Sequence, residues 1–297
     1  MIKRKWLTML PMVFLLLIFT EIFAQNSKTP VYEPPLSSEI KLPNTIILHQ
    51  NLRYAPIPEI ATDSTTDRIL DLYRPLNDKR KEPLPVFVFI HGGGFTGGDK
   101  RLLDLCSKIA AQGFAVVSIN YRLTLKYKKV SGASCSANMS KGLPANGTFH
   151  PVLNEAINNA SDDAISALQW IKDNASKYGL NINKVAISGG SAGGMTALHV
   201  AYVAKQKILP IMAVVNLWGG LENADVISKN SPPILIYHGD LDETINIAYA
   251  HAIKERMDSI GSQKSQLQVL KGKGHAQYNL IVKEKIGEIV AFLNTFL

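Results

Sequence analysis

Residues 185–194 read Val-Ala-Ile-Ser-Gly-Gly-Ser-Ala-Gly-Gly, an apolar run that breaks into the pattern Gly-x-Ser-x-Gly. The apolar run predicts a β-strand, and residues 195–205 predict a helix. A serine on a sharp turn between a strand and a helix takes a strained conformation that exposes its hydroxyl, and small residues at Gly189 and Gly193 let the strand and the helix come close together. The start of the helix also presents free backbone N–H groups to an anion. We therefore expect Ser191 to be a nucleophile.

The rest of the chain alternates between apolar runs, which predict buried strands, and segments with apolar residues at helical spacing. Its 297 residues, 46% of them hydrophobic, are enough for one large core and favour a single catalytic domain. Strands are expected at 45–49, 68–73, 86–90, 114–120, 185–188, 211–217, 233–237 and 266–270, and helices at 101–112, 162–177, 195–205 and 278–297. This pattern predicts an α/β protein with a mostly parallel, doubly wound sheet of about eight strands, helices on both faces and an antiparallel start.

The amino terminus has the features of a secretory signal peptide. Three basic residues, Lys3, Arg4 and Lys5, precede an apolar run of 13 residues, and a small residue, Ala24, follows at a suitable cleavage position. The apolar run is shorter than the roughly 20 residues that span a bilayer. We expect residues 1–24 to direct export, so that the mature protein is secreted or periplasmic without stable insertion in a membrane.

Three further segments follow from composition. Residues 25–43 contain four prolines and predict an extended N-terminal arm, and residues 44–297 form the expected catalytic domain. Within that domain, residues 124–152 predict a long irregular insertion, which either covers the active site or is a tolerated surface loop. Two cysteines, Cys106 and Cys135, are compatible with one disulfide in an exported protein, and their spacing leaves that question open.

The formal net charge of +8 comes mainly from scattered lysines, with a short cluster at Lys126, Lys128 and Lys129. Scattered positive charge is typical of a solvated surface, so we expect no nucleic-acid partner. Neither cysteine has the spacing of a metal site or a redox motif, and we expect no metal and no organic cofactor. The sequence indicates no oligomeric state.

A second glycine-rich segment, His91-Gly92-Gly93-Gly94, follows the strand expected at 86–90. Backbone without side chains can approach a ligand and turn its N–H groups toward it. Alone, the segment would read as a flexible loop. Beside the turn at Ser191, it is expected to form the other side of an oxyanion hole, with the N–H groups of Gly93, Gly94 and Ala192 as donors.

Acidic residues and a histidine follow the last two expected strands. Asp240, Asp242 and Glu243 come just after the strand at 233–237, where a partly desolvated carboxylate can orient a histidine. Asp240 and Glu243 could instead cap the helix that starts near Ile247. His275 lies on a glycine-rich loop after the strand at 266–270, where it can project over the end of the sheet.

These motifs make residues 45–297 similar to the α/β-hydrolase superfamily, and most similar to its hormone-sensitive-lipase-like and feruloyl-esterase-like esterases. The oxyanion motif His-Gly-Gly-Gly falls on 91–94, the elbow Gly-x-Ser-x-Gly-Gly on 189–194, the acid motif His-Gly-x-x-Asp-x-x-Val on 238–245, and Gly-His on 274–275. The resemblance places the acid on Asp242.

The sequence also departs from the hormone-sensitive-lipase-like pattern. Gly190 stands before the serine, where those esterases usually carry aspartate, and no large cap domain is expected. Three aromatic residues near strand ends, Phe95, Tyr121 and Trp218, are candidates for the pocket wall, although such residues are more often part of the core.

The resemblance implies an exported serine carboxylesterase with a triad of Ser191, His275 and Asp242. Its substrates would be small-molecule or polysaccharide-linked esters carrying short-chain acyl, acetyl or feruloyl groups. Two alternatives remain open. One is a serine peptidase of the prolyl-oligopeptidase type, and the other is a non-catalytic binding protein with a hydrolase fold.

Overall fold

The computed structural model describes residues 37–42, 46–57, 67–76, 82–144 and 147–297. The signal peptide expected at residues 1–24 lies outside these ranges, as does most of the expected arm. No helix in the described ranges combines the length and the hydrophobicity that crossing a bilayer requires.

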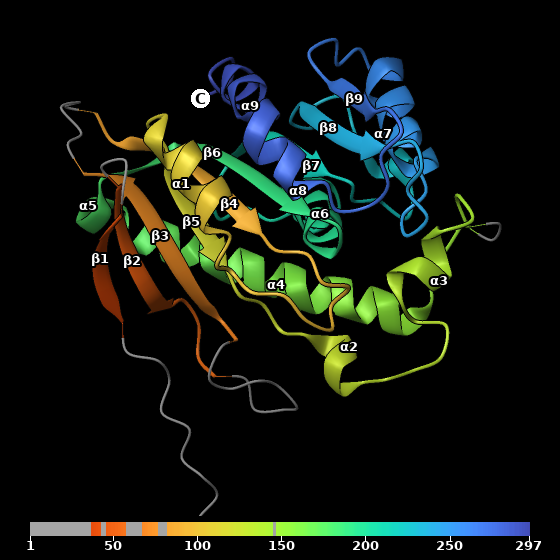
Figure 1. Cartoon of the computed structure of the whole chain (residues 1–297), viewed down its shortest axis with the longest axis horizontal. Coiled ribbons are helices and arrows are strands. Elements are labelled where there is room, and N and C mark those ends of the chain that lie inside the picture. Colours follow the sequence, from red (N-terminus) through yellow and green to blue (C-terminus); the bar gives the residue numbers. More distant parts are fainter. Residues whose placement is uncertain (1–36, 43–45, 58–66, 77–81, 145–146) are drawn as a thin grey trace, which may run out of the picture. The chain divides into compact units, whose positions relative to one another are not determined.

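Nine strands of the described residues form one sheet, in the order β1-β2-β3-β5-β4-β6-β7-β8-β9 (Figure 1). The strands are β1 (Ser38–Leu42), β2 (Ile46–Arg53), β3 (Ile69–Pro75), β4 (Leu84–Ile90), β5 (Ala115–Ile119), β6 (Leu180–Gly190), β7 (Ile211–Leu217), β8 (Ile234–Gly239) and β9 (Gln266–Leu270). In the sheet order from β5 through β4 to β9, each strand pairs parallel with the next. The other pairs, β1 with β2, β2 with β3 and β3 with β5, are antiparallel. The prediction of a mostly parallel sheet with an antiparallel start is confirmed.

Strand β1 is one more strand than the sequence pattern indicated. The arm expected at 25–43 ends in this strand, which pairs with β2 from Ser38 opposite Gln50 to Leu42 opposite Ile46. Four of its five residues are exposed, so the alternation between buried and exposed positions that reveals most strands is missing. Backbone pairing at the edge of the sheet therefore holds this strand, although its side chains show no pattern from which a strand could be predicted.

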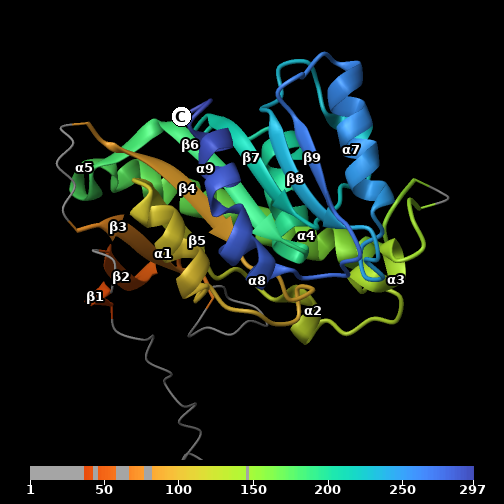
Figure 2. The ribbon, with the colours of Figure 1, turned by 45° about the horizontal axis from the view of Figure 1, so that its top comes forward.

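Helices cover both faces of the sheet, as predicted (Figure 2). The main ones are α1 (Leu103–Ala111), α4 (Pro151–Asp173), α6 (Ala192–Leu198), α7 (Ala248–Ser259) and α9 (Ile286–Leu293). In β4, Val86 and Val88 belong to the core cluster shared with α4, α6 and α7, whereas Phe87 and Phe89 belong to the cluster shared with α1 and α9. Successive side chains of a strand point to opposite faces, so one strand contributes to both cores.

The remaining helical segments are short. They are α2 (Thr124–Tyr127), α3 (Cys135–Met139), α5 (Ala175–Tyr178), the π-helical turns η1 (His199–Val203) and η3 (Ile281–Lys285), the 3₁₀ turn η2 (Ala224–Val226) and α8 (Tyr278–Leu280). The serine helix expected at 195–205 is α6 followed by η1, and the closing helix expected at 278–297 is α8, η3 and α9 in succession.

The helix expected at 162–177 begins at Pro151 in the structure, so the sequence-based start was wrong. Proline suits the first turn of a helix, and Nδ1 of His150 accepts a hydrogen bond from the N–H of Val152 at 3.1 Å. Polar residues in the first turns of α4 interrupt the apolar pattern from which the start of the helix was predicted. The irregular insertion expected at 124–152 accordingly ends where α4 begins, and it contains the short helices α2 and α3.

Parallel pairing brings the carboxyl ends of β4, β6, β8 and β9 to one edge of the sheet. The segment His91–Gly94 follows β4, Ser191 follows β6, Asp242 follows β8 and His275 follows β9. Every site residue expected from the sequence therefore lies near that edge, as the rule for open α/β sheets requires.

Candidate active site

Ser191 stands between β6 and α6 in a backbone conformation that is rare for a residue with a side chain, with φ of 55° and ψ of −122°. Its N–H donates to the carbonyl of Leu217 in β7 at 2.9 Å, and its own carbonyl accepts from the N–H of Met195 in α6 at 2.9 Å. These two bonds tie the turn to a neighbouring strand and to the helix, so the surrounding structure holds the strained residue in place.

The glycines around Ser191 are required by close backbone approach. A Cβ on Gly189 would lie 2.3 Å from the carbonyl group of Gly193, and a Cβ on Gly193 would lie 2.0 Å from the carbonyl oxygen of Ile90. No side chain fits at those distances. The strand and helix thus approach each other as the sequence pattern predicted.

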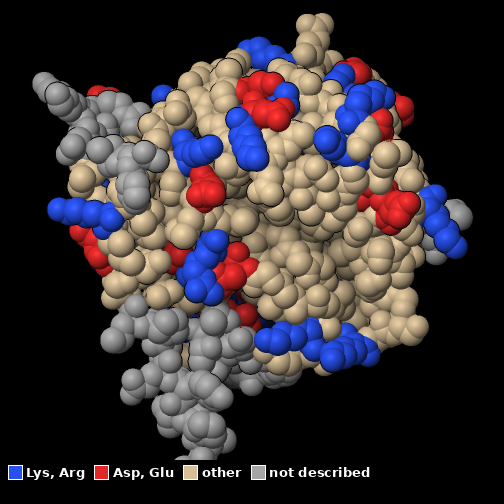
Figure 3. Space-filling model, viewed as in Figure 1, with Lys and Arg blue, Asp and Glu red and all other residues tan. Residues whose placement is uncertain are grey.

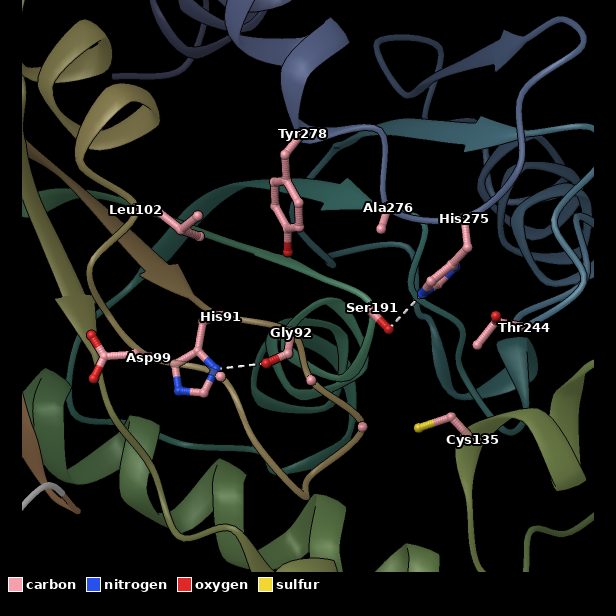
Figure 4. Close-up of a pocket in the computed structure, with 13 residues that line it drawn as sticks. His91, Gly92, Asp99, Leu102, Cys135, Ser191, Thr244, His275, Ala276 and Tyr278 are labelled. Atoms are coloured by element: carbon pink, nitrogen blue, oxygen red, sulfur yellow. Dashed lines mark hydrogen bonds between the residues drawn. The ribbon is translucent and has the colours of Figure 1, made fainter.

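Three side chains form a hydrogen-bonded series at the edge of the sheet. His275 Nε2 lies 2.8 Å from Ser191 Oγ (Figure 4), and His275 Nδ1 lies 2.7 Å from Asp242 Oδ2. A carboxylate only accepts hydrogen bonds, so Nδ1 carries the proton and Nε2 is free to accept one from the serine hydroxyl. The series can move a proton from Ser191 to an imidazole whose tautomer is set by Asp242.

The surroundings of Asp242 favour its ionised form. Its side chain is fully buried, and one oxygen, Oδ1, accepts the N–H groups of Thr244 and Ile245 at 2.9 Å each. Burial by itself would raise the pKa of Asp242, but hydrogen bonds from His238, His275 and the backbone hold that pKa well below its usual range. The carboxylate is therefore available to stabilise a protonated His275.

The structure also separates Asp242 from the neighbouring carboxylates. Asp240 Oδ1 accepts the N–H of Gly272 at 2.7 Å and its other oxygen lies 3.5 Å from Lys271 Nζ, while the side chain of Glu243 is exposed. Of the three carboxylates after β8, Asp242 is the one that contacts His275.

The loop after β4 forms one wall of the same site. Gly93 and Gly94 have φ of 115° and 62°, and the carbonyl of Gly93 accepts the N–H groups of Thr96 and Gly97 at 3.0 and 3.1 Å. Within the described residues, the N–H groups of Gly93 and Gly94 donate to no backbone acceptor. Ala192 is the first residue of α6, so its N–H has no partner within the helix.

His91 stabilises this loop. Its Nδ1 donates to the carbonyl of Gly92 at 2.6 Å, and its own carbonyl accepts the hydroxyl of Tyr121 at 2.9 Å, with the two rings stacked at 4.5 Å. A Cβ on Gly98 would lie 2.3 Å from that same Nδ1, so the chain packs tightly there. Burial lowers the pKa of His91 to about 4, against the raising effect of its hydrogen bond to Gly92, and the ring is neutral near pH 7.

Ser191 and His275 line a cavity of about 460 Å³ with a largely apolar wall (Figure 4). Its lining includes residues that sequence reasoning missed, namely Leu102, Cys135, Thr244, Ala276 and Tyr278. Thr244, Ala276 and Tyr278 lie within three residues of Asp242 or His275 in the sequence, whereas Leu102 and Cys135 come from segments far from both. The ring of Tyr278 points from α8 toward the turn that holds Ser191.

The aromatic residues suggested for the pocket wall do not line the cavity. Phe95, Tyr121 and Trp218 are fully buried and are absent from the lining of the cavity. Trp218 has a supporting position, because its ring meets those of His275 and Tyr278 edge-on at 6.5 and 4.9 Å.

Cys106 and Cys135 are free thiols in this structure. They belong to the two core clusters on opposite faces of the sheet, so the disulfide that the sequence left open is not formed. Burial raises the pKa of each thiol to about 12, which keeps both protonated and unreactive.

In the described part of the chain, no three histidine, cysteine, aspartate or glutamate side chains gather in a metal-binding arrangement. On the face seen in Figure 3, several Lys and Arg side chains lie beside Asp or Glu, a group of Lys and Arg lies along the lower edge, and a broad area between them carries no charged side chain.

Comparison with known proteins adds to this geometry. The sequence model of the phospholipase/carboxylesterase family matches residues 75–297. An esterase, LipC from Mycobacterium tuberculosis, is 24% identical over 279 residues, which cover 76% of this chain and 62% of that protein. The chain therefore spans less than two thirds of this relative.

Solved structures share the fold at low sequence identity. A truncated carbohydrate esterase from gut microbiota superposes with a TM-score of 0.61 at 18% identity, covering 86% of this chain and 98% of that one. A propionate-bound esterase from Thermogutta terrifontis also gives 0.61, at 19% identity, covering 83% of this chain and 93% of that one.

Proposed function

Because the chain belongs to the phospholipase/carboxylesterase family of α/β-hydrolases, we propose that it hydrolyses carboxylic esters through an acyl-enzyme formed on Ser191. The observation that carries the proposal is the hydrogen-bonded series in which His275 lies 2.8 Å from Ser191 and 2.7 Å from Asp242. A nucleophile, a base and a group that orients the base are the parts that acyl transfer needs.

In the first half of the reaction, Ser191 Oγ attacks the ester carbonyl while His275 Nε2 takes its proton. The carbonyl oxygen becomes an oxyanion that the N–H groups of Gly93, Gly94 and Ala192 bind. The intermediate collapses to an acyl-serine, and the alcohol leaves with the proton from Nε2. Asp242 stays ionised and stabilises the imidazolium between the two transfers.

In the second half, water takes the place of the alcohol. His275 Nε2 removes a proton from the water as its oxygen attacks the acyl carbon, and the same proton returns to Ser191 Oγ when the carboxylic acid leaves. The enzyme ends in its starting state, and no redox partner or metal is used in this scheme.

The cavity favours acyl groups that are small or flat and apolar. Its volume of about 460 Å³ and its largely apolar wall suit short-chain, acetyl or feruloyl esters, free or attached to a polysaccharide. The likeness to a structure described as a carbohydrate esterase supports the polysaccharide-linked class. Export by residues 1–24, to the periplasm or the medium, would bring the enzyme to such polymers.

The purified protein should be assayed on p-nitrophenyl acetate, butyrate and palmitate, on acetylated and feruloylated oligosaccharides, and on a prolyl p-nitroanilide. We expect turnover of the short-chain or oligosaccharide esters, and none of the anilide. Cleavage of the anilide alone would favour a peptidase, and binding without any turnover would favour a non-catalytic protein.

A further inference from the structure

A second histidine, His238, lies against the same carboxylate that His275 uses. His238 is in β8 and its side chain is fully buried. Its Nε2 is 2.7 Å from the carbonyl oxygen of Ile245 and 3.3 Å from Asp242 Oδ2. A carbonyl oxygen only accepts hydrogen bonds, so Nε2 carries a proton that it donates to Ile245, and Asp242 Oδ2 lies beside the same N–H.

His238 completes the set of donors around Asp242. Oδ1 accepts two backbone N–H groups, from Thr244 and Ile245, and Oδ2 lies between two imidazoles, those of His275 and His238. The backbone donors fix one oxygen. The position of the other oxygen, which orients the base, depends on the two rings.

The same side chain closes the loop that carries Asp242. The contact from His238 to Ile245 spans the turn between them, and Asp242 lies inside it. The next residue, Gly239, packs against the loop that carries His275, because a Cβ there would lie 2.2 Å from the carbonyl oxygen of Lys273. His238 is thus placed where the two loops meet.

A role in filling space does not account for an imidazole at this position. Within the described residues, Nδ1 of His238 is buried without a hydrogen-bond partner. Burying an unsatisfied polar atom is unfavourable, and an apolar side chain of similar size would avoid that cost. The feature that an apolar side chain lacks is the N–H that donates to Ile245 and lies beside Asp242 Oδ2.

We propose that His238 is a positioning residue, whose Nε2–H holds Asp242 Oδ2 in line with Nδ1 of His275. The proposal rests on the proposed function, since its effect on turnover requires that Asp242 and His275 act in catalysis. It assigns no contact between His238 and the substrate. The proposal implies that the rate of acyl transfer depends on His238, a hydrogen-bond donor that acts on the base His275 through Asp242.

Two variants of similar size separate the donor from the volume. His238→Gln keeps an N–H near the position of Nε2, and His238→Met removes it. Misplacing a catalytic group by about 1 Å costs roughly 100-fold in rate, so we expect the methionine variant to lose about 10- to 100-fold in kcat, with KM within about twofold. The glutamine variant should recover most of that loss.

A matched control is His199→Met, which changes a partly buried histidine of η1 that lies outside the site. It should leave kcat unchanged. If the wild-type protein hydrolyses no ester, the proposed function fails. If the wild type is active and a folded His238→Met protein keeps its kcat, only the role of His238 is overturned.

A measurement on the unmutated protein covers the case in which the methionine variant fails to fold. Nitrogen-15 correlation spectra of the imidazoles report which ring nitrogen carries the proton. We expect the ring of His238 to carry a proton on Nε2, which faces the carbonyl of Ile245. Finding the proton on Nδ1 instead, with Nε2 bare, would overturn the proposal, since no donor would then face Asp242.

Discussion

The hydroxyl of Tyr278 occupies the space into which a side chain at position 190 would project. A Cβ on Gly190 would lie 2.0 Å from that oxygen and 2.7 Å from Cζ of the same ring. The edge-on contact with Trp218 at 4.9 Å supports the ring in this position. Gly190, at the position where hormone-sensitive-lipase-like esterases usually carry aspartate, therefore has a steric reason in this chain.

A first prediction follows for Gly190→Ala. The added methyl group would collide with Tyr278, so we expect a loss of about 1–3 kcal/mol in the free energy of unfolding, the usual cost of overpacking. Adding Tyr278→Phe removes the hydroxyl oxygen that lies nearest to the new methyl group, so the double variant should regain part of the lost stability. Urea unfolding of the two single variants and the double variant measures the coupling, and strictly additive losses would contradict the contact.

The oxyanion loop offers a matched pair of glycines. A Cβ on Gly93 would lie 2.1 Å from the carbonyl oxygen of Gly97, whereas a Cβ on Gly94 has Thr96 Oγ1, at 3.9 Å, as its nearest neighbour. We expect Gly93→Ala to displace the loop and to lower kcat by at least about 100-fold, the usual effect of losing one oxyanion donor. Gly94→Ala should cost clearly less in an ester assay of the two folded proteins, and the reverse order would contradict the assignment.

Asp242→Asn tests the orienting carboxylate. A neutral amide neither fixes the tautomer of His275 nor stabilises its cation, so we expect kcat to fall by about 10⁴-fold with little change in KM. The control is Asp240→Asn, which alters a carboxylate bound to Gly272 and Lys271 away from the base. Steady-state kinetics of both variants decide the matter, and equal effects would show that Asp242 has no special role.

The buried ring of His91 predicts a pH dependence of stability. Its pKa is lowered by burial from the usual 6.5 to about 4, so between these values the unfolded chain binds a proton that the folded protein does not. Stability therefore rises with pH across this window and is lost as pH falls through it, with a slope of up to about 1.4 kcal/mol per pH unit.

Urea unfolding of the wild type and of His91→Gln, between pH 4.5 and 7, measures that slope. The wild type should show the steeper dependence on pH. Burial also lowers the pKa of His49 and His199, but both are present in the two proteins and cancel in the difference. Parallel curves would mean that His91 titrates normally in the folded state.

Local motifs made much of the site predictable. The turn at Ser191 and the glycine loop after β4 depend on a few consecutive residues, so the sequence alone indicated their conformations. Asp242 needed more than local pattern, because Asp240 and Glu243 follow the same strand. Only the folded loop shows that Asp240 binds Gly272 instead.

Features that depend on distant contacts could not be predicted in the same way. Strand β1 carries almost no burial signal, since backbone pairing at an edge places it. The cavity wall combines Leu102, Cys135 and Tyr278, which are far apart in the sequence and come together only in the folded protein. The contact of His238 with Asp242 could not be predicted either, because the sequence shows only two residues four positions apart.

The central claim is that an acyl group passes through Ser191. Rapid acid quenching of the protein during turnover of a slowly deacylated p-nitrophenyl ester, followed by peptide mass spectrometry, measures this directly. We predict one acyl group per chain on the peptide that contains Ser191, and no adduct or turnover in Ser191→Ala. An adduct on another residue, or unchanged turnover in the alanine variant, would contradict the account.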